Sequence, residues 1–231
     1  MQEKSVNTYK DLKMANKYRD ALKNARLYLI LDTEVQSYNS LLEIAQSAIQ
    51  HGVDIVQFRD KKGTAKNILK FSDDLLKWIQ HNSMGKQIPF IINDRVDLAL
   101  VSGACGVHLG QEDVPAWWAR KILGPHAIIG VSCQTLKQAQ LAQHEGADYI
   151  GFGSVFKTKT KPERSAMELK LLAEVIRKIK IPVFAIGGID SEKILKLHPL
   201  GVNRIAVCRA VCEAKNIPGA VRGLMEALDV H

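Results

Sequence analysis

The sequence predicts an α/β protein folded as a (β/α)8 TIM barrel, and two observations lead to this fold class. From Arg26 onward, short apolar runs alternate with longer amphipathic stretches, which is typical of parallel strands buried under covering helices. Eight such units of about 26 residues fit between residues 26 and 231, the size expected of one closed barrel. We therefore expect a barrel domain at residues 26–231 and an N-terminal helical extension at residues 1–25.

The apolar runs locate the strands, and the amphipathic stretches between them locate the helices. The expected strands are Arg26–Leu31, Asp54–Phe58, Pro89–Ile92, Gly106–Leu109, Ala127–Val131, Tyr149–Gly151, Pro182–Ile186 and Arg204–Val207. The expected helices are Ser40–Gln50, Thr64–His81, Asp97–Val101, Pro115–Ile122, Leu136–His144, Glu168–Lys178, Ser191–Leu197 and Gly219–Leu228.

A weak internal repeat supports this count of elements. Gly52–Asp54, Gly146–Asp148 and Gly201–Asn203 each end a helix and lead directly into a strand. A doubly wound open sheet is the alternative, and it needs a glycine-rich dinucleotide turn after an early strand. The first strand leads instead into Asp32–Glu34, which favours the barrel.

Composition indicates a soluble protein of the cytoplasm. Apolar residues make up 46% of the chain, yet no apolar run approaches the length that crosses a bilayer. Residues 1–25 lack the apolar centre of a secretory signal, and the four cysteines are not spaced as a disulfide framework. We expect reduced thiols, no zinc site and a cytoplasmic location.

The net charge of +8 indicates an acidic partner without naming it, since nucleic acid, an anionic membrane and phosphorylated substrates all attract a positive field. Residues 1–26 hold seven Lys or Arg and three acids, so about half of the excess lies in the extension. A solvated basic helix explains that part of the charge.

Polar residues follow most of the expected strands, as the active site of a barrel requires at its C-terminal end. The segments are Gln57–Lys62, Asn93–Arg95, His108–Asp113, Ser132, Gly153–Lys161 and Gly187–Gly188. Each one alone is ordinary, because an exposed cation or a helix-capping Asp is common in loops.

The convergence of these segments predicts a site for a metal and a diphosphate. Asp94 and Asp113 follow neighbouring strands and are placed to share one hard cation, for which Mg²⁺ suits oxygen ligands better than zinc does. Arg59, Lys61 and Lys161 supply positive charge for a diphosphate bridging that cation.

Two further features are compatible with a phosphorylated substrate and also with ordinary loops. Gly187–Gly188 allows backbone N–H groups to approach a second phosphate, or simply forms a tight turn. Thr158 and Thr160 alternate through a basic loop that is either a lid over a charged substrate or a solvated turn. His108 either lines the site or is a hydrogen-bonded core residue.

Five runs, in order along the chain, carry a family resemblance. They are Gln57–Lys61, Ile92–Leu100 (INDRVDLAL), Gly106–Gln111 (GVHLGQ), Gly146–Lys161 and Ala185–Ile189 (AIGGI). Together they span nearly the whole barrel, each at a strand end, and they resemble thiamine phosphate synthases. The resemblance implies a transferase that joins an aminopyrimidine methyl diphosphate to a thiazole ethyl phosphate, with Mg²⁺ as cofactor and release of pyrophosphate.

The resemblance also implies roles for matching residues. The pyrimidine and its diphosphate are expected at Gln57, Phe58, Arg59, Asp60, Lys61, Asn93, Ser132 and Lys161, of which Arg59, Ser132 and Lys161 are expected to act in catalysis. Mg²⁺ is expected at Asp94 and Asp113. The loop over the thiazole corresponds to Thr158, Lys159 and Thr160, and its phosphate pocket to Gly188, Cys208 and Arg209. The expected partners are small phosphorylated substrates, not nucleic acid or membrane, and the sequence does not decide whether a homo-oligomer forms.

On the family's mechanism the C–O bond breaks first, and the thiazole nitrogen captures the pyrimidine-stabilised carbocation. Metal and cations neutralise the charge of the leaving diphosphate, and the closed site excludes water. No nucleophilic side chain is required.

The sequence departs from the family pattern at five positions. Ser154 and Lys157 stand where prolines are common, Cys133 and Gln134 replace a Thr-His pair, and Arg209 stands where a small Ser is usual. None of these changes removes an expected metal or diphosphate residue.

Two alternatives compete with the synthase hypothesis. A related barrel, the thiazole tautomerase, transfers protons through a histidine that would fall at Gln134, and an amide does not shuttle a proton as imidazole does. A non-catalytic regulator that binds phosphorylated ligands is the second. Asp94, Asp113 and Lys161 argue against it, because a pure binder has no need to activate a leaving group.

Overall fold

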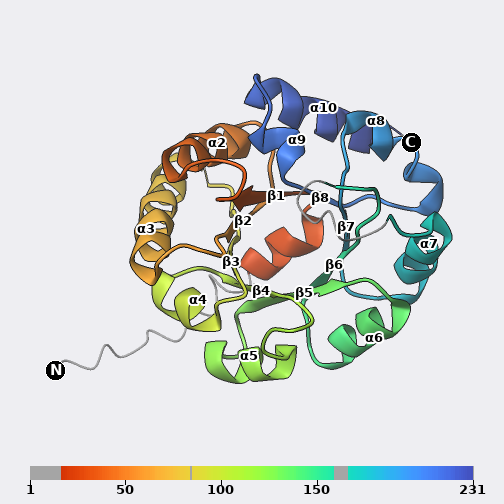
Figure 1. Ribbon diagram of the computed structural model, residues 1–231, viewed down its shortest axis with the longest axis horizontal. Helices are drawn as coiled ribbons and strands as arrows, with labels where there is room; N and C mark the ends of the chain where they lie inside the picture. Colours follow the sequence, from red (N-terminus) through yellow and green to blue (C-terminus); the bar gives the residue numbers. More distant parts are fainter. Residues whose placement is uncertain (1–16, 84, 159–165, 231) are drawn as a thin grey trace.

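Eight parallel strands close into a barrel in the computed structural model, which describes residues 17–83, 85–158 and 166–230. Each strand pairs with the next, and β8 pairs with β1 (Figure 1). The strands are β1 (Leu27–Asp32), β2 (Ile55–Arg59), β3 (Phe90–Asn93), β4 (Gly106–Leu109), β5 (Ile128–Cys133), β6 (Tyr149–Phe152), β7 (Val183–Ile186) and β8 (Ile205–Val207). The expected (β/α)8 barrel is confirmed, and every expected strand overlaps its counterpart.

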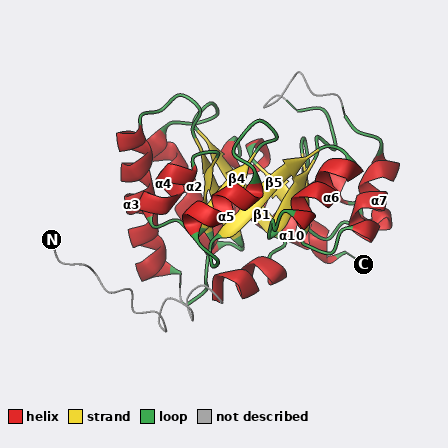
Figure 2. Ribbon diagram, turned by 90° about the horizontal axis from the view of Figure 1, so that it is seen from below, coloured by secondary structure: helices red, strands yellow, loops and turns green. Residues whose placement is uncertain are grey.

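Helices surround the barrel on its outside (Figure 2). They are α2 (Tyr38–Gln50), α3 (Ala65–Asn82), α4 (Val96–Ser102), α5 (Ala116–Leu123), α6 (Leu136–His144), α7 (Leu169–Lys178), α8 (Ser191–Ile194), α9 (Arg209–Cys212) and α10 (Ile217–Asp229). Side-chain oxygens of Ser37, Thr64, Thr135, Asp190 and Asn216 accept first-turn backbone N–H groups. These caps satisfy donors that a helix start leaves unpaired, and so determine where five of the helices begin.

Two helical segments differ from the expectation. The helix expected at Ser191–Leu197 ends at Ile194 and is followed by a 3₁₀ turn, η1 (His198–Leu200). Pro199 lacks an N–H donor and disfavours a continuous helix through this point. The short helix α9 was not expected, because its four residues are too few to show a helical period.

A helix of residues 17–24 covers one end of the barrel, and it lies across the centre of the view in Figure 1. Its Leu22 and the following Ala25 are buried against the inward side chains Tyr28, Ile55 and Phe184. This is the N-terminal end of the strands, so the opposite, C-terminal end is the open one. Residues 1–16 of the expected extension lie outside the described residues.

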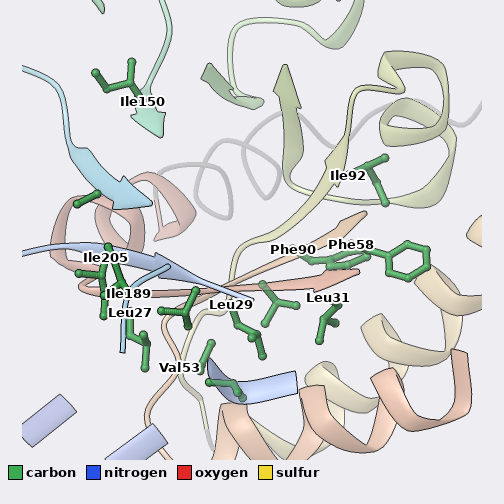
Figure 3. Packing of buried hydrophobic residues seen from close by; sticks show 14 of the residues in the cluster. Leu27, Leu29, Leu31, Val53, Phe58, Phe90, Ile92, Ile150, Ile189 and Ile205 are labelled. Carbon is green, nitrogen blue, oxygen red and sulfur yellow. The ribbon is translucent and has the colours of Figure 1, made fainter. Parts of the chain in front are cut away.

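Alternation along the strands separates two layers of core. Leu27, Leu29 and Leu31 on β1 point outward and pack under the helices, as Figure 3 shows. Tyr28 and Ile30 point into the barrel interior. The period of two in a strand therefore sends every second residue to the barrel interior, where the site forms.

Among the residues that the structure describes, no helix is both long and apolar enough to span a bilayer.

Candidate active site

A cavity opens at the C-terminal end of the barrel, where the polar strand ends meet. The residues that line it include eight expected from the sequence: Gln57, Arg59, Asn93, Ser132, Thr158, Gly188, Cys208 and Arg209. They come from strands and loops far apart along the chain, and closure of the barrel brings them together.

The cation Arg59 is held by two carboxylates, one at the end of β1 and one in the loop after it. Its guanidinium donates to Asp32 at 2.6 Å and lies 3.3 Å from Glu34. Asp32 is fully buried and stands directly beside Arg59 in the β1–β2 register. Hydrogen bonds from Lys62 and Arg59 lower the pKa of the Glu34 carboxyl. The buried ion pair orients Arg59 before any substrate binds.

Sequence reasoning missed Asp32 as a site residue. The sequence does indicate it, because Asp32 lies at the C-terminal end of the first strand, and polar residues at the C-terminal ends of barrel strands form the active site.

The two carboxylates expected to bind metal contact one another in the loops that follow β3 and β4. Burial, and then the hydrogen bond and charge of Asp113, raise the pKa of Asp94 above its ordinary value. Lys61 donates to Asp94, and Asp113 accepts the backbone N–H of Gly110 at 2.6 Å. Two carboxylates this close repel each other unless a proton or a cation lies between them.

This pair fits a magnesium site better than a site built from protein ligands alone. The described residues contain no group of three or more His, Cys, Asp or Glu placed around one point. Mg²⁺ is commonly bound through one or two carboxylates together with substrate phosphates and water. Asp94 and Asp113 would hold the ion, and a bound diphosphate would supply further oxygens.

Phe58 and Asp60 are not among the residues that line the cavity, and their side chains make other contacts. Phe58 points outward from β2 and stacks on Phe71 with ring centroids 4.0 Å apart, because strand side chains alternate and Gln57 and Arg59 point inward. The Asp60 carboxylate accepts the Tyr38 hydroxyl and two backbone N–H groups of its own loop. These residues pack the barrel and close a turn.

The double glycine after β7 forms a turn that larger residues would not fit. Gly187 and Gly188 have φ values of 108° and 63°. A Cβ on Gly188 would lie 2.5 Å from the carbonyl oxygen of Lys157, and one on Gly187 would lie 2.5 Å from the Ser154 hydroxyl. Glycine therefore lets the loop after β6 pack directly on this turn at the cavity wall.

Cys208 and Arg209 follow β8 and line the same wall. A hydrogen bond with Cys212 and burial raise the pKa of the Cys208 thiol, so this thiol stays neutral. The Arg209 guanidinium ion-pairs with Glu213 one turn along α9. Arg209 thus borders the cavity while its charge is partly satisfied by a neighbour.

The remaining expected residues fall into two groups. Thr158 lines the cavity, and Lys159, Thr160 and Lys161 lie outside the described residues. His108, for which the sequence left two roles open, fits both: it lines the cavity and is also hydrogen-bonded inside the barrel, to Ser132 and Tyr149.

This fold and site define a (β/α)8-barrel enzyme for phosphorylated substrates. A family model described as thiamine monophosphate synthase matches residues 27–211, and the chain belongs to this family. A thiamine-phosphate synthase of Ruminiclostridium cellulolyticum is 39% identical over 87% of this chain and 93% of its own length. One of Methanobrevibacter smithii is also 39% identical, over the same shares of the two chains.

A solved structure gives the same result. The thiamine phosphate pyrophosphorylase of Pyrococcus furiosus superposes with a TM-score of 0.80 at 33% identity, covering 91% of this chain and 97% of that one. The relatives and the structural neighbour together make this protein a transferase of thiamine biosynthesis, and small phosphorylated molecules are its substrates.

Proposed function

We propose that the protein condenses 4-amino-2-methyl-5-(diphosphooxymethyl)pyrimidine with a thiazole ethyl phosphate, giving thiamine monophosphate and pyrophosphate, and that Mg²⁺ is required. One observation carries the proposal. Asp94, which is ion-paired with Lys61, contacts Asp113 and directly follows Asn93, and Asn93 lines the cavity together with the preoriented cation Arg59. A site of this charge pattern suits a diphosphate with its metal ion.

The pyrimidine half is assigned to the β2, β3 and β5 side of the cavity. Gln57 and Asn93 offer amide groups that match the amino group and ring nitrogens of a pyrimidine. Arg59 and Ser132 lie on the same wall and donate hydrogen bonds to the diphosphate. Lys161 is proposed to stabilise the charge that grows on the leaving oxygen as the C–O bond breaks.

Asp94 and Asp113 would hold a magnesium ion, which would neutralise charge on the leaving diphosphate. Lys61 pairs with Asp94 in the free protein. Burial and the Asp113 carboxylate raise the pKa of Asp94, and a divalent cation would offset the repulsion between the two carboxylates.

The thiazole half is assigned to the β6, β7 and β8 side. Gly188 lets the backbone approach a phosphate closely, and Arg209 is within reach of the same wall. Thr158, with Lys159 and Thr160, would cover the thiazole ring and exclude water from the carbocation.

The test is a pyrophosphate-release assay with both purified substrates and Mg²⁺. Release is expected only when both substrates and the metal are present. Asp113→Asn should lose this activity, while Asp97→Asn, an exposed carboxylate on α4 that pairs with Arg95, should keep it. Binding of either substrate without any release would favour the regulator, and isomerisation of a thiazole without pyrophosphate would favour the tautomerase.

A further inference from the structure

A row of hydrogen-bonded polar side chains crosses the barrel interior beneath the cavity. The amide nitrogen of Gln57 donates to the Tyr28 hydroxyl at 2.8 Å, and the hydroxyls of Tyr28 and Tyr149 are 2.7 Å apart. The Tyr149 hydroxyl lies 3.0 Å from His108 Nδ1, and His108 Nε2 lies 2.9 Å from Ser132 Oγ. The row thus connects Gln57 and Ser132, two cavity residues assigned to the pyrimidine diphosphate, through the centre of the barrel.

Four of the five side chains in this row are buried. Gln57, Tyr28 and Tyr149 are each at most 2% exposed, and His108 is 7% exposed. The ring of Phe184 packs edge-on against both tyrosines. A buried hydroxyl without a partner is costly, so each of these hydrogen bonds is strongly favoured over its absence.

A glycine on β5, Gly130, makes the row possible because it has no side chain. His108, Gly130 and Tyr149 stand side by side on β4, β5 and β6. A Cβ on Gly130 would lie 2.1 Å from Cζ of Tyr149 and 2.4 Å from its hydroxyl oxygen. Glycine at this position therefore leaves the space through which the Tyr149 ring reaches His108.

The direction of every proton in the row follows from its first member. An amide nitrogen only donates, so the Tyr28 oxygen accepts from Gln57. Among the described residues, the other hydrogen-bond partner of Tyr28 is Tyr149, so Tyr28 donates there. Tyr149 then donates to Nδ1 of His108, and the imidazole proton is left on Nε2, facing Ser132. Burial raises the pKa of both phenols, which keeps their protons in place at neutral pH.

We propose that Tyr28 and Tyr149 are positioning residues that hold His108 as the neutral Nε2–H tautomer, so that the Ser132 hydroxyl accepts from His108 and directs its own hydrogen into the cavity. The last step rests on the proposed function, in which an anionic diphosphate oxygen receives that hydrogen. The Ser132 hydroxyl, which could otherwise rotate freely, becomes a hydrogen-bond donor of fixed direction. Its direction is set through the row by the Gln57 amide, which also lines the cavity.

The first test reads the tautomer directly in the free protein. ¹⁵N NMR of histidine-labelled protein, with His108 assigned by comparison with His108→Asn, should show a protonated Nε2 and an unprotonated Nδ1. Gln57→Glu replaces the donor by an acceptor of the same shape and should reverse the row, moving the proton to Nδ1. Gln111→Glu is the matched control, because the Gln111 amide donates to the Ser132 carbonyl outside the row, and the tautomer should not change.

A second variant covers the case in which Gln57→Glu does not fold. Tyr149→Phe keeps the ring and deletes the hydroxyl, so the Nδ1–H form should become populated. In the synthase assay this variant should lose roughly tenfold in kcat, with little change in KM, because Ser132 would no longer be aimed at the leaving group.

The outcomes separate this inference from the proposed function. Nδ1–H in the unmodified protein, or an Nε2–H tautomer that neither Gln57→Glu nor Tyr149→Phe disturbs, would overturn it. A protein without pyrophosphate release but with the expected tautomer changes would refute the synthase proposal and leave the proton arrangement standing.

Discussion

The buried ion pair between Asp32 and Arg59 should be a large single contributor to the stability of the site. Asp32 is fully buried, the Arg59 side chain is 13% exposed, and their atoms are 2.6 Å apart. Asp32→Asn keeps the shape and can still accept the backbone N–H of Glu34, which lies 3.0 Å from Asp32. The change removes one charge and leaves Arg59 partly buried beside a neutral amide.

The expected loss is about 3 kcal/mol in the free energy of unfolding. Breaking a buried pair by removing one partner costs about 3–5 kcal/mol, and the contact of Arg59 with Glu34 places this case at the lower end. For a chain of this size, 1 kcal/mol shifts Tm by roughly 2–4 °C, so Asp32→Asn should melt about 6–12 °C lower.

Urea denaturation and thermal melting measure both quantities. Glu34→Gln is the matched control, since it removes the other, 37% exposed carboxylate that contacts Arg59, and it should lower Tm much less than Asp32→Asn does. If the two variants melt within about 2 °C of each other, the buried pair does not contribute the expected stability.

Four further outcomes are expected. Asp94→Ala and Asp113→Ala should each abolish most Mg²⁺-dependent pyrophosphate release, and near-normal turnover at limiting Mg²⁺ would remove that residue from the metal site. Lys161→Ala should lower kcat more than it raises KM, whereas a change in KM alone would make Lys161 a binding residue. Arg209→Ser should raise KM for the thiazole phosphate about tenfold and spare the pyrimidine diphosphate; an unchanged KM would mean that Arg209 does not contact this phosphate. Burial raises the pKa of the Cys133 thiol to about 12, so stability is complete below the ordinary thiol pKa and falls as pH rises toward 12. Urea denaturation of Cys133→Ala should show a smaller loss of stability between pH 8 and pH 10.5 than the unmodified protein, and equal losses would contradict the assignment.

The sequence by itself determined the barrel and most of its C-terminal rim. The alternation of apolar runs with amphipathic stretches is a local property of the sequence. A parallel strand buried on both faces is a continuous apolar run, which can be identified without knowing which strands lie beside it. The rule that polar residues at strand ends form the site then selected Arg59, Asn93 and Ser132, which line the cavity. The resemblance also pointed to Phe58 and Asp60, which do not line the cavity, because a run of matching residues does not show which side chains face inward.

The tertiary structure decided what depends on distance across the barrel. Asp32 becomes a partner of Arg59 through the strand register, and Tyr28 meets Tyr149 although 121 residues separate them. The space at Gly130 has meaning only once the Tyr149 ring fills it. Such contacts depend on the strand register and on closure of the sheet. A single sequence does not show which inward-facing side chains will be neighbours in the barrel.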